Sequence, residues 1–148
     1  MLNLAKDLKI IRVMNAVAAG TSNQDATTID TAGYDGVVFL TAFGTITATA
    51  VTSVKLGGGA ASDGSDKADL AGTGSGTLTP TTHNNKVVVT EIYRPQQRYI
   101  TLSVLRGTAN AVIDGSVAIL YRGRAVPTTN DASVAARVVT VSPATGTP

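Results

Sequence analysis

Short β-branched segments separated by turn residues run through most of this chain. In the strongest, residues 37–43 (Val-Val-Phe-Leu-Thr-Ala-Phe), nearly every position is apolar. Such a segment is typical of a strand covered on both faces, and we expect it to be central. Beyond it, residues 46–56 alternate with a period of two, so that Ile46, Val54 and Leu56 share one face. This alternation predicts a second strand with one buried and one wet face.

The second half of the chain repeats this pattern. Residues 86–93 are rich in valine, and after a proline break an alternating strand begins at Tyr99. Residues 107–110 (Gly-Thr-Ala-Asn) have the length and chemistry of a hairpin connection. We therefore expect the strand that begins at Tyr99 to pair with residues 111–121 as an antiparallel hairpin. Gly115 interrupts the second of these strands and is expected to mark a bulge.

The remaining segments are weaker. Residues 26–31 predict a short strand, and the three glycines at 57–59 are expected to end the strand before them. Glycine, serine, aspartate and threonine dominate the following residues up to Gly76, which predicts a surface loop. One late strand is possible at residues 137–141.

Seven or eight short strands with turns between them predict an all-β fold. An antiparallel β-sandwich, a jelly-roll-like arrangement and a small barrel all fit this pattern. We expect an N-terminal arm or short helix at residues 1–12, a single β domain at residues 13–126 and a C-terminal arm at residues 127–148. A chain of 148 residues is long enough to bury a core without a metal or a disulfide.

Composition and charge narrow the classes of function. The chain contains no cysteine, which excludes a thiolate nucleophile and a zinc–thiolate site. No apolar segment approaches the roughly 18 residues of a membrane span, and the N-terminus does not resemble a signal peptide, so we expect no membrane association and no export by that route. The net charge of +2 is too small to imply nucleic-acid binding. Residues 86–148, however, carry seven bases and three acids, which suits either protected strand edges or a contact surface for an acidic partner.

A glycine-rich loop carries three aspartates at intervals of three, Asp63, Asp66 and Asp69. Calcium prefers several oxygen ligands from such loops. The spacing is not that of an EF-hand, which alternates its ligands and ends in glutamate. We therefore interpret these residues as an ordinary solvated loop.

The candidates for catalysis are few. The only histidine, His83, has no nucleophile motif near it in sequence, which favours an exposed loop position. Glu91 and Asp114 lie on predicted strands and could pair as in a glycosidase, although outward charges on half-exposed strands are the commoner explanation. Tyr93, Arg94, Arg98 and Tyr99 flank a proline and predict a corner in which arginines lie along aromatic rings. We predict no enzyme activity, no cofactor and no metal site.

Several phrases together resemble small structural proteins of tailed bacteriophages, encoded among the head genes, and in particular capsid decoration (cement) proteins. The phrases are Gly-Tyr-Asp-Gly-Val-Val-Phe at 33–39, Gly-Thr-Ile-Thr-Ala-Thr-Ala at 44–50, Ser-Asp-Gly-Ser and Ala-Asp-Leu-Ala-Gly-Thr between 62 and 73, Tyr-Arg-Pro-Gln-Gln-Arg-Tyr at 93–99, and Arg-Gly-Thr-Ala-Asn-Ala-Val-Ile-Asp-Gly at 106–115. The resemblance covers most of residues 10–127. It implies a β-rich protein, often a homotrimer, that bridges subunits of the major capsid protein on the capsid exterior after assembly in the host cytoplasm.

Charge clustering and terminal position suggest where such a protein would touch the capsid. The candidate contact residues are Lys6, Lys9, Arg12, Arg94 and Arg98. Two other functions remain open at this point. One is a tail-tube or head–tail joining subunit of the same kind of virion, and the other is a carbohydrate-binding β-sandwich for host adhesion.

Overall fold

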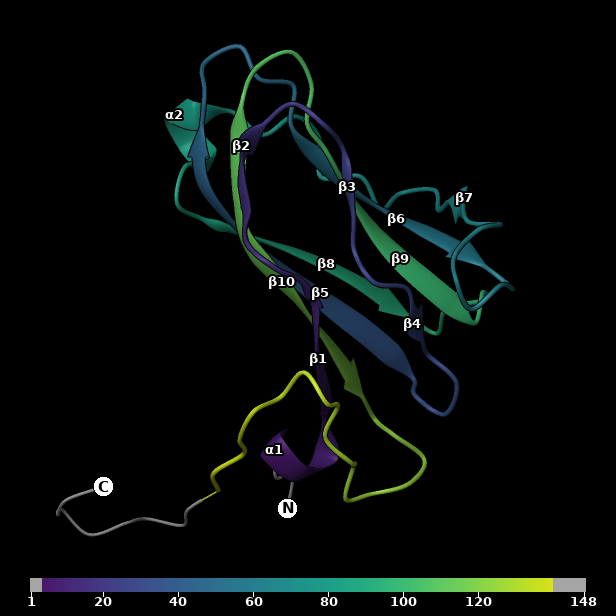
Figure 1. Cartoon of the computed structure of the whole chain (residues 1–148). Coiled ribbons are helices and arrows are strands. Elements are labelled where there is room, and N and C mark those ends of the chain that lie inside the picture. Colours follow the sequence, from purple (N-terminus) through teal and green to yellow (C-terminus); the bar gives the residue numbers. More distant parts are fainter. Residues whose placement is uncertain (1–3, 140–148) are drawn as a thin grey trace, which may run out of the picture.

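The chain folds into a β-sandwich. A computed structural model describes residues 4–139 and shows two five-stranded antiparallel sheets packed face to face (Figure 1). The predicted all-β sandwich is therefore confirmed. The strand pattern favours this result because each sheet has a strongly apolar inner face, which leaves water by packing against the other sheet.

The first sheet, sheet A, has the strand order β1-β10-β5-β8, and β2 also pairs with β10. All its pairings are antiparallel. The central pair is β5 and β10, which run side by side from Gly36–Tyr121 to Ile46–Ala111. The bounds are β1 (Lys9–Met14), β2 (Val17–Gly20), β5 (Gly36–Ile46), β8 (Val87–Tyr93) and β10 (Ala111–Tyr121).

The second sheet, sheet B, has the order β3-β9-β6-β7, and β4 also pairs with β9. Two helices of a single turn, α1 (Leu4–Asp7) and α2 (Pro80–His83), lie outside the sheets (Figure 1). The strand bounds are β3 (Gln24–Asp25), β4 (Ile29–Asp30), β6 (Ser53–Gly59), β7 (Ala68–Asp69) and β9 (Tyr99–Leu105).

The core lies between the two sheets and consists mainly of small aliphatic side chains. Phe39 and Phe43 of β5 are its largest members, and both are fully buried. They meet inward side chains of β6 and β9, such as Leu56 and Leu102. Removing these apolar surfaces from water is the main favourable contribution to folding.

The predicted hairpin between β9 and β10 is wrong. The two strands lie in different sheets, and residues 106–110 carry the chain from sheet B to sheet A. Arg106 holds this crossing. Its side chain is only 5% exposed and donates to the backbone carbonyls of Ala18, Ser22 and Ala111. A connection of this length suits a hairpin and a crossing between sheets equally well. The hydrogen bonds from Arg106 to the distant carbonyls of Ala18 and Ser22 hold the crossing in place.

Two predicted boundaries in the first half also differ from the structure. Residues 46–56 are not one strand, because β5 ends at Ile46 and a turn containing Thr49 at φ 70° precedes β6. The glycines at 57–59 do not end β6 but belong to it. A side chain at Gly59 would collide with the carboxylate of Asp66, and one at Gly58 would crowd Gln97. Glycine here permits close approach of neighbouring chain, as it commonly does within strands.

Two weaker predictions are also refined. Of the strand predicted at residues 26–31, only β4 is present, and residues 26–28 separate it from β3. The loop predicted up to Gly76 contains the two-residue strand β7, which pairs with Gly57 and Gly58 of β6. Through this pairing, part of the loop forms the edge of sheet B next to β6.

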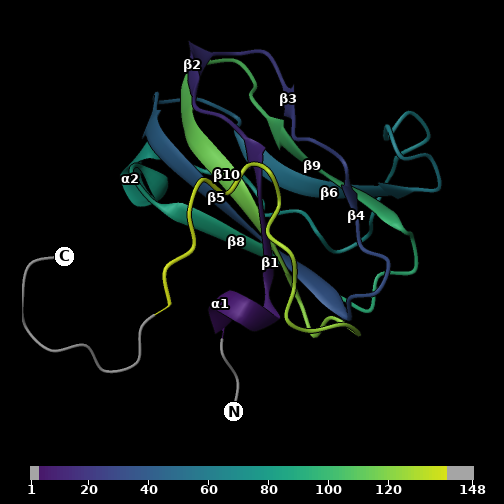
Figure 2. The same ribbon diagram turned by 60° about the horizontal axis from the view of Figure 1, so that its bottom comes forward.

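The terminal segments pack against each other rather than standing apart. Residues 9–12, which we expected in the N-terminal arm, belong to β1. Thr128 donates its backbone N–H to the carbonyl of Lys6 (2.7 Å), and the N–H of Arg12 donates to the Ser133 hydroxyl (2.9 Å). Figure 2 shows this C-terminal segment, in yellow, beside α1 and β1. Of the late strand expected at 137–141, residues 137–139 are irregular and the remainder lies outside the described residues.

Gly115 marks a bulge in β10, as predicted. The pairing register between β10 and β5 shifts between Ile113 and Gly115, and Gly115 has a φ of 137°. The extra residue allows Ile113 and Ser116 both to point into the core, although they lie three positions apart. The bulge therefore sets which side chains of β10 face outward beyond it.

Replacing Gly115 by alanine should destabilise the fold by about 2 kcal/mol, because the positive φ is strained for any side chain. The new Cβ would also lie 3.1 Å from the carbonyl oxygen of Met14. Urea unfolding measures the change. Gly74→Ala is the matched control, since a Cβ there meets no atom within 4 Å. Equal stability of the two variants would contradict the assignment of a required bulge.

Candidate interaction surface

The outward faces of the two sheets differ in chemistry. The outer face of sheet B is polar: Lys55 pairs with Asp69 (2.6 Å), and Lys67 pairs with Asp25 (2.5 Å). Desolvation opposes ionisation of Asp25, but hydrogen bonds from Lys67 and Ser103 outweigh it and leave the pKa of this carboxyl below its usual value. This face has the alternation of apolar-in and polar-out that is usual for a sheet facing water.

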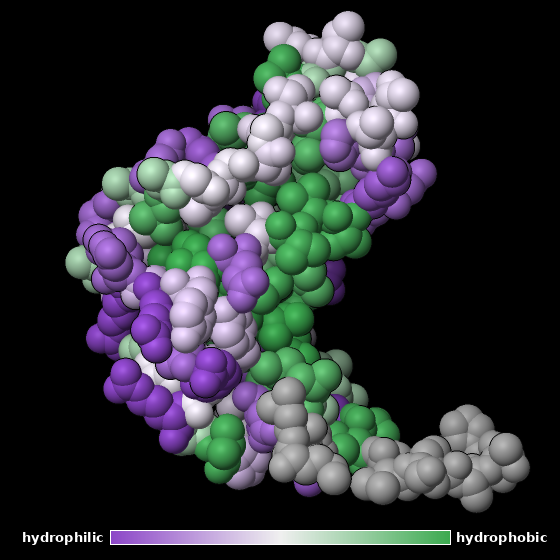
Figure 3. Space-filling model, turned by 180° about the vertical axis from the view of Figure 1, so that it is seen from behind, coloured by the Kyte–Doolittle hydropathy of each residue, from purple (hydrophilic) through white to green (hydrophobic). Residues whose placement is uncertain are grey.

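The outer face of sheet A is apolar. Residues of β5 alternate between the core and this face, so Phe39 points inward while Leu40 and Ala42 lie half-buried on the outside. In β10, Val117 and Ile119 do the same. Figure 3 shows hydrophobic side chains gathered along the hollowed side of the molecule. We expected residues 37–43 to be covered on both faces, but within residues 4–139 only the inner face is covered, by sheet B.

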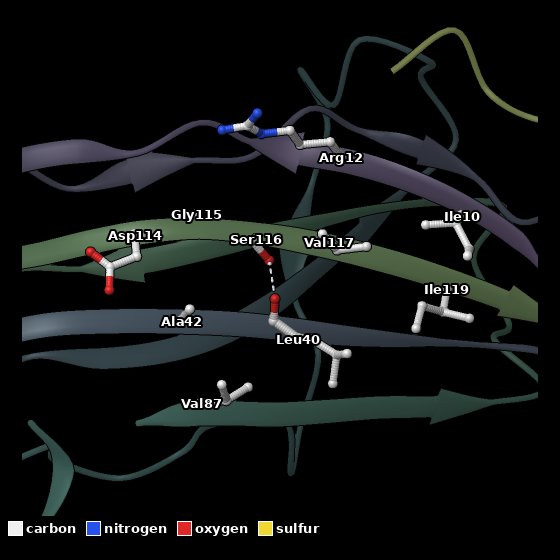
Figure 4. A pocket seen from close by; sticks show the side chains of 10 residues that line it. All are labelled: Ile10, Arg12, Leu40, Ala42, Val87, Asp114, Gly115, Ser116, Val117 and Ile119. Atoms are coloured by element: carbon white, nitrogen blue, oxygen red, sulfur yellow. Dashed lines mark hydrogen bonds between the residues drawn. The ribbon is translucent and has the colours of Figure 1, made fainter. Parts of the chain in front are cut away.

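This face forms an open hollow of about 630 Å³, which we call the apolar hollow. Four strands contribute to it, so no single segment of sequence defines it. Figure 4 shows the aliphatic side chains along its floor, with Arg12 and Asp114 as its charged residues. Its lining residues are Ile10, Arg12, Leu40, Ala42, Val87, Asp114, Gly115, Ser116, Val117 and Ile119.

Ser116, one of the residues that line the hollow, turns its hydroxyl toward the core, where it is already engaged. The Ser116 hydroxyl lies 3.2 Å from the Leu40 carbonyl, to which it donates, and 3.0 Å from the Thr41 hydroxyl (Figure 4 shows the first contact). What the hollow offers a ligand is therefore aliphatic surface, with a cation and a carboxylate from β1 and β10. Such a surface suits another protein, because protein contacts combine an apolar centre with a charged rim.

The neighbouring strand β8 continues this apolar surface to the edge of the sheet. Val87 is 55% exposed and Val89 is 62% exposed, which is unusual for valines in a strand. Glu91 follows them on the same face and accepts a hydrogen bond from the Tyr121 hydroxyl (2.5 Å). Burial, together with this contact, raises the pKa of Tyr121 to about 12. A contiguous exposed apolar surface of this kind commonly marks an interaction site.

The predicted corner of arginines and tyrosines is present. The Arg94 guanidinium lies 5.1 Å from the Tyr93 ring centroid, and that of Arg98 lies 5.1 Å from the Tyr99 ring centroid. Arg98 also donates two hydrogen bonds, of 3.0 and 2.7 Å, to the Asp30 carboxylate. Its hydrogen bonds hold the pKa of Asp30 below its usual value. Arg98 therefore joins β4 to the start of β9, and Arg94 is the cation of this corner without an ion pair in the described part of the chain.

The structure brings the five candidate cations only partly together. Lys6 lies in α1, while Lys9 and Arg12 lie in β1, where Arg12 reaches the apolar hollow. The register places Lys9 in line with Leu120, Val37 and Ile92, across all four strands. Lys9 and the Arg94 corner thus occupy the same end of sheet A, on opposite edges about 14 Å apart at the usual strand spacing.

The three loop aspartates have separate partners. Asp66 accepts from the backbone N–H groups of Ala60 and Ala61, and these bonds lower its pKa. Asp69 pairs with a lysine, and Asp63 accepts from the N–H of Ser65. Among residues 4–139, no group of three acidic or histidine side chains could hold a metal ion.

His83 is bound within its own turn, and the two carboxylates lie far apart. The Nδ1 atom of His83 accepts from the N–H of Thr79 (2.9 Å), which closes the single turn of α2. Glu91 lies opposite Val38, which is itself opposite Ile119, five residues along β10 from Asp114. The rise of a strand then separates the two carboxylates by about 16 Å, too far for a glycosidase pair.

Sequence reasoning missed the apolar hollow and the exposed valines of β8. A signal was present, because residues 37–40, 87–89 and 117–120 are apolar at consecutive positions. Such segments are typical of strands covered on both faces, whereas within residues 4–139 sheet B covers only one face of sheet A. No described helix is long and apolar enough to cross a membrane. No protein-family model matches the chain, and no curated protein matches it.

The pair between Arg98 and Asp30 should make stability fall faster in acid. The folded state holds the Asp30 pKa below its unfolded value, so the pair stabilises the fold above about pH 4 and this contribution disappears as the pH falls through the folded pKa. Urea unfolding between about pH 5 and about pH 2 should show a smaller loss for Arg98→Met than for the wild type. Asp30→Asn should behave like Arg98→Met, and identical pH profiles for all three chains would contradict the pairing.

Proposed function

We propose that this chain is a structural protein of a virion, specifically a capsid decoration protein that docks on the outside of a mature phage head. The apolar hollow of sheet A is the surface that meets the major capsid protein. The observation that carries the proposal is this exposed apolar face, which contrasts with the paired charges on the outer face of sheet B. The resemblance of the phrases at 33–50 and 93–115 supplies the class of partner.

The chemistry of the hollow supports a protein partner more strongly than a carbohydrate. Its side chains are mainly aliphatic, with Leu40, Val117 and Ile119 at the centre. Carbohydrate sites usually rest on exposed aromatic platforms, whereas the residues that line the hollow include no aromatic side chain. Arg12, at the hollow, supplies a cation to an acidic capsid surface, in keeping with its place among the candidate contacts.

The mechanism is stabilisation by mass action. A protein that binds the assembled shell and not its free subunits shifts the equilibrium away from disassembly. Symmetry multiplies each weak contact over many copies, so a modest affinity per copy is sufficient. No chemical turnover takes part, and a rigid sandwich is a suitable scaffold because it holds four strands of the contact surface in fixed register.

Substitution of Val117 tests this surface. Val117→Asp and Val117→Lys should both weaken binding to mature heads that lack the protein, by at least about tenfold, because each places a charge in an apolar contact. Cosedimentation with purified heads measures the loss. Ser53→Asp, on the outer face of sheet B, is the control that should bind normally.

The two charges at position 117 also separate mechanisms. If only one sign weakens binding, the contact is electrostatic rather than apolar. Full binding by both variants would overturn the assignment of the hollow. Assembly of the purified chain into hexameric rings or tubes would instead favour a tail-tube or joining subunit.

A further inference from the structure

The free edge of β8 is a second unpartnered feature of sheet A. Within residues 4–139, β8 pairs only with β5, and so it forms one edge of the sheet (Figure 4). Natural proteins protect such edges with lysine, proline, bulges or covering segments. The strand Val87–Tyr93 contains no lysine or proline, and its pairing with β5 shows no bulge.

The backbone hydrogen bonds define which groups of this edge are free. Arg94 N–H donates to the Asp35 carbonyl, and Phe43 N–H donates to the Lys86 carbonyl. In an antiparallel ladder these bonds alternate, so the even-numbered residues of β8 bond to β5. The N–H and carbonyl groups of Val87, Val89 and Glu91 therefore point away from the sheet. An added strand would find a ready ladder there.

A segment of matching pattern occurs near the C-terminus. Residues 137–141 read Arg-Val-Val-Thr-Val, a β-branched run, and Pro143 then prevents further ladder bonds. In the described part of this segment, Val138 is 85% exposed. Among the described residues, the Arg137 side chain donates to the backbone carbonyls of Ala5 and Thr128. Nine residues of the chain follow Val139.

One antiparallel register matches the two segments in both charge and shape. It places Arg137 opposite Glu91, Val139 opposite Val89, and Val141 opposite Val87. All three β8 residues are those with free backbone groups, and their side chains share the outer face. Oppositely charged and β-branched pairs directly across a ladder stabilise it. Glu91 is the only charged residue of β8, which makes the arginine complementary to this edge.

With Ser133 bound to β1, the segment cannot reach the β8 edge of its own chain. The Ser133 hydroxyl accepts from the Arg12 N–H at the far edge of β1, on the opposite side of sheet A. A position beyond β8 lies four strand spacings away, or about 19 Å. The four residues from Ser133 to Arg137 span about 14 Å when fully extended. While Ser133 keeps this bond, the partner strand comes from a second molecule.

We propose that residues 137–141 of one copy add to the free edge of β8 of a second copy as an antiparallel strand. Arg137 exchanges its two carbonyl partners for Glu91 of the neighbouring molecule. Because donor segment and acceptor edge are different surfaces, copies can exchange segments in pairs or pass them around a closed ring. The added valines lie beside Val87 and Val89 and widen the apolar surface of sheet A. This contact goes beyond the proposed function and does not depend on what the hollow binds.

Sedimentation velocity of the full chain tests the proposal, in a concentration series up to about 100 µM, where micromolar contacts are saturated. The wild type should form a discrete oligomer. Val139→Asp combined with Val141→Asp should remain monomeric, because two carboxylates replace apolar cross-strand contacts. Thr145→Asp combined with Thr147→Asp carries the same added charge beyond Pro143 and should associate like the wild type.

A charge exchange tests the register. Glu91→Arg alone should weaken association by about tenfold or more, and adding Arg137→Glu should restore it. Circular dichroism and the unfolding midpoint show that each variant is folded. A monomeric wild type, an oligomer that survives the Val139 and Val141 substitutions, or a charge exchange that restores nothing would overturn the proposal.

Discussion

The antiparallel pair of β5 and β10 is the interaction on which the rest of this structure depends. Its alternation sends Phe39 and Leu120 into the core and leaves Leu40 and Val117 on the opposite face. The same register that builds the sandwich therefore builds the apolar hollow. Because the bulge at Gly115 adds one residue to β10, the core-facing positions change from odd numbers before it, such as Ile113, to even numbers after it, such as Leu120.

The apolar outer face has an energetic meaning. Each Å² of apolar surface removed from water contributes about 25 cal/mol to stability. Burial of Leu40, Val117 and Ile119 would therefore be favourable. The outer face of sheet B, by contrast, is held by ion pairs such as that of Lys55 with Asp69. The molecule thus has one polar outer face and one apolar outer face. The free edge of β8 adds a directional ladder beside the second of these faces.

The sequence pattern predicts the elements of the fold better than their partners. Segments such as 37–43 and 111–121, and the bulge at Gly115, are local signals that the structure confirms. The hairpin between β9 and β10 fails because residues 107–110 suit two connections, and the bonds of Arg106 to carbonyls 84 and 88 residues away select the crossing between sheets. In the sequence, glycines 57–59 likewise look like the end of a strand. In the structure, they belong to β6 and allow Asp66 and Gln97 to lie close to its backbone.

In the candidate site, too, the sequence predicts contacts between neighbouring residues but not those between distant ones. Charge clustering identifies Arg94 and Arg98, and the rings beside them follow from adjacent tyrosines. The partner of Arg98, however, is Asp30, 68 residues away. The hollow joins four strands that span residues 10 to 119, so only the assembled sheet reveals it.

The central claim is that the outer face of sheet A is a docking surface in a larger particle. Cryo-electron microscopy of the intact virion at side-chain resolution tests it most directly. The account predicts density for this chain on the outer capsid lattice, with Leu40 and Val117 buried against the major capsid protein. A chain attached through the polar face of sheet B, with the apolar hollow open to solvent, would contradict it.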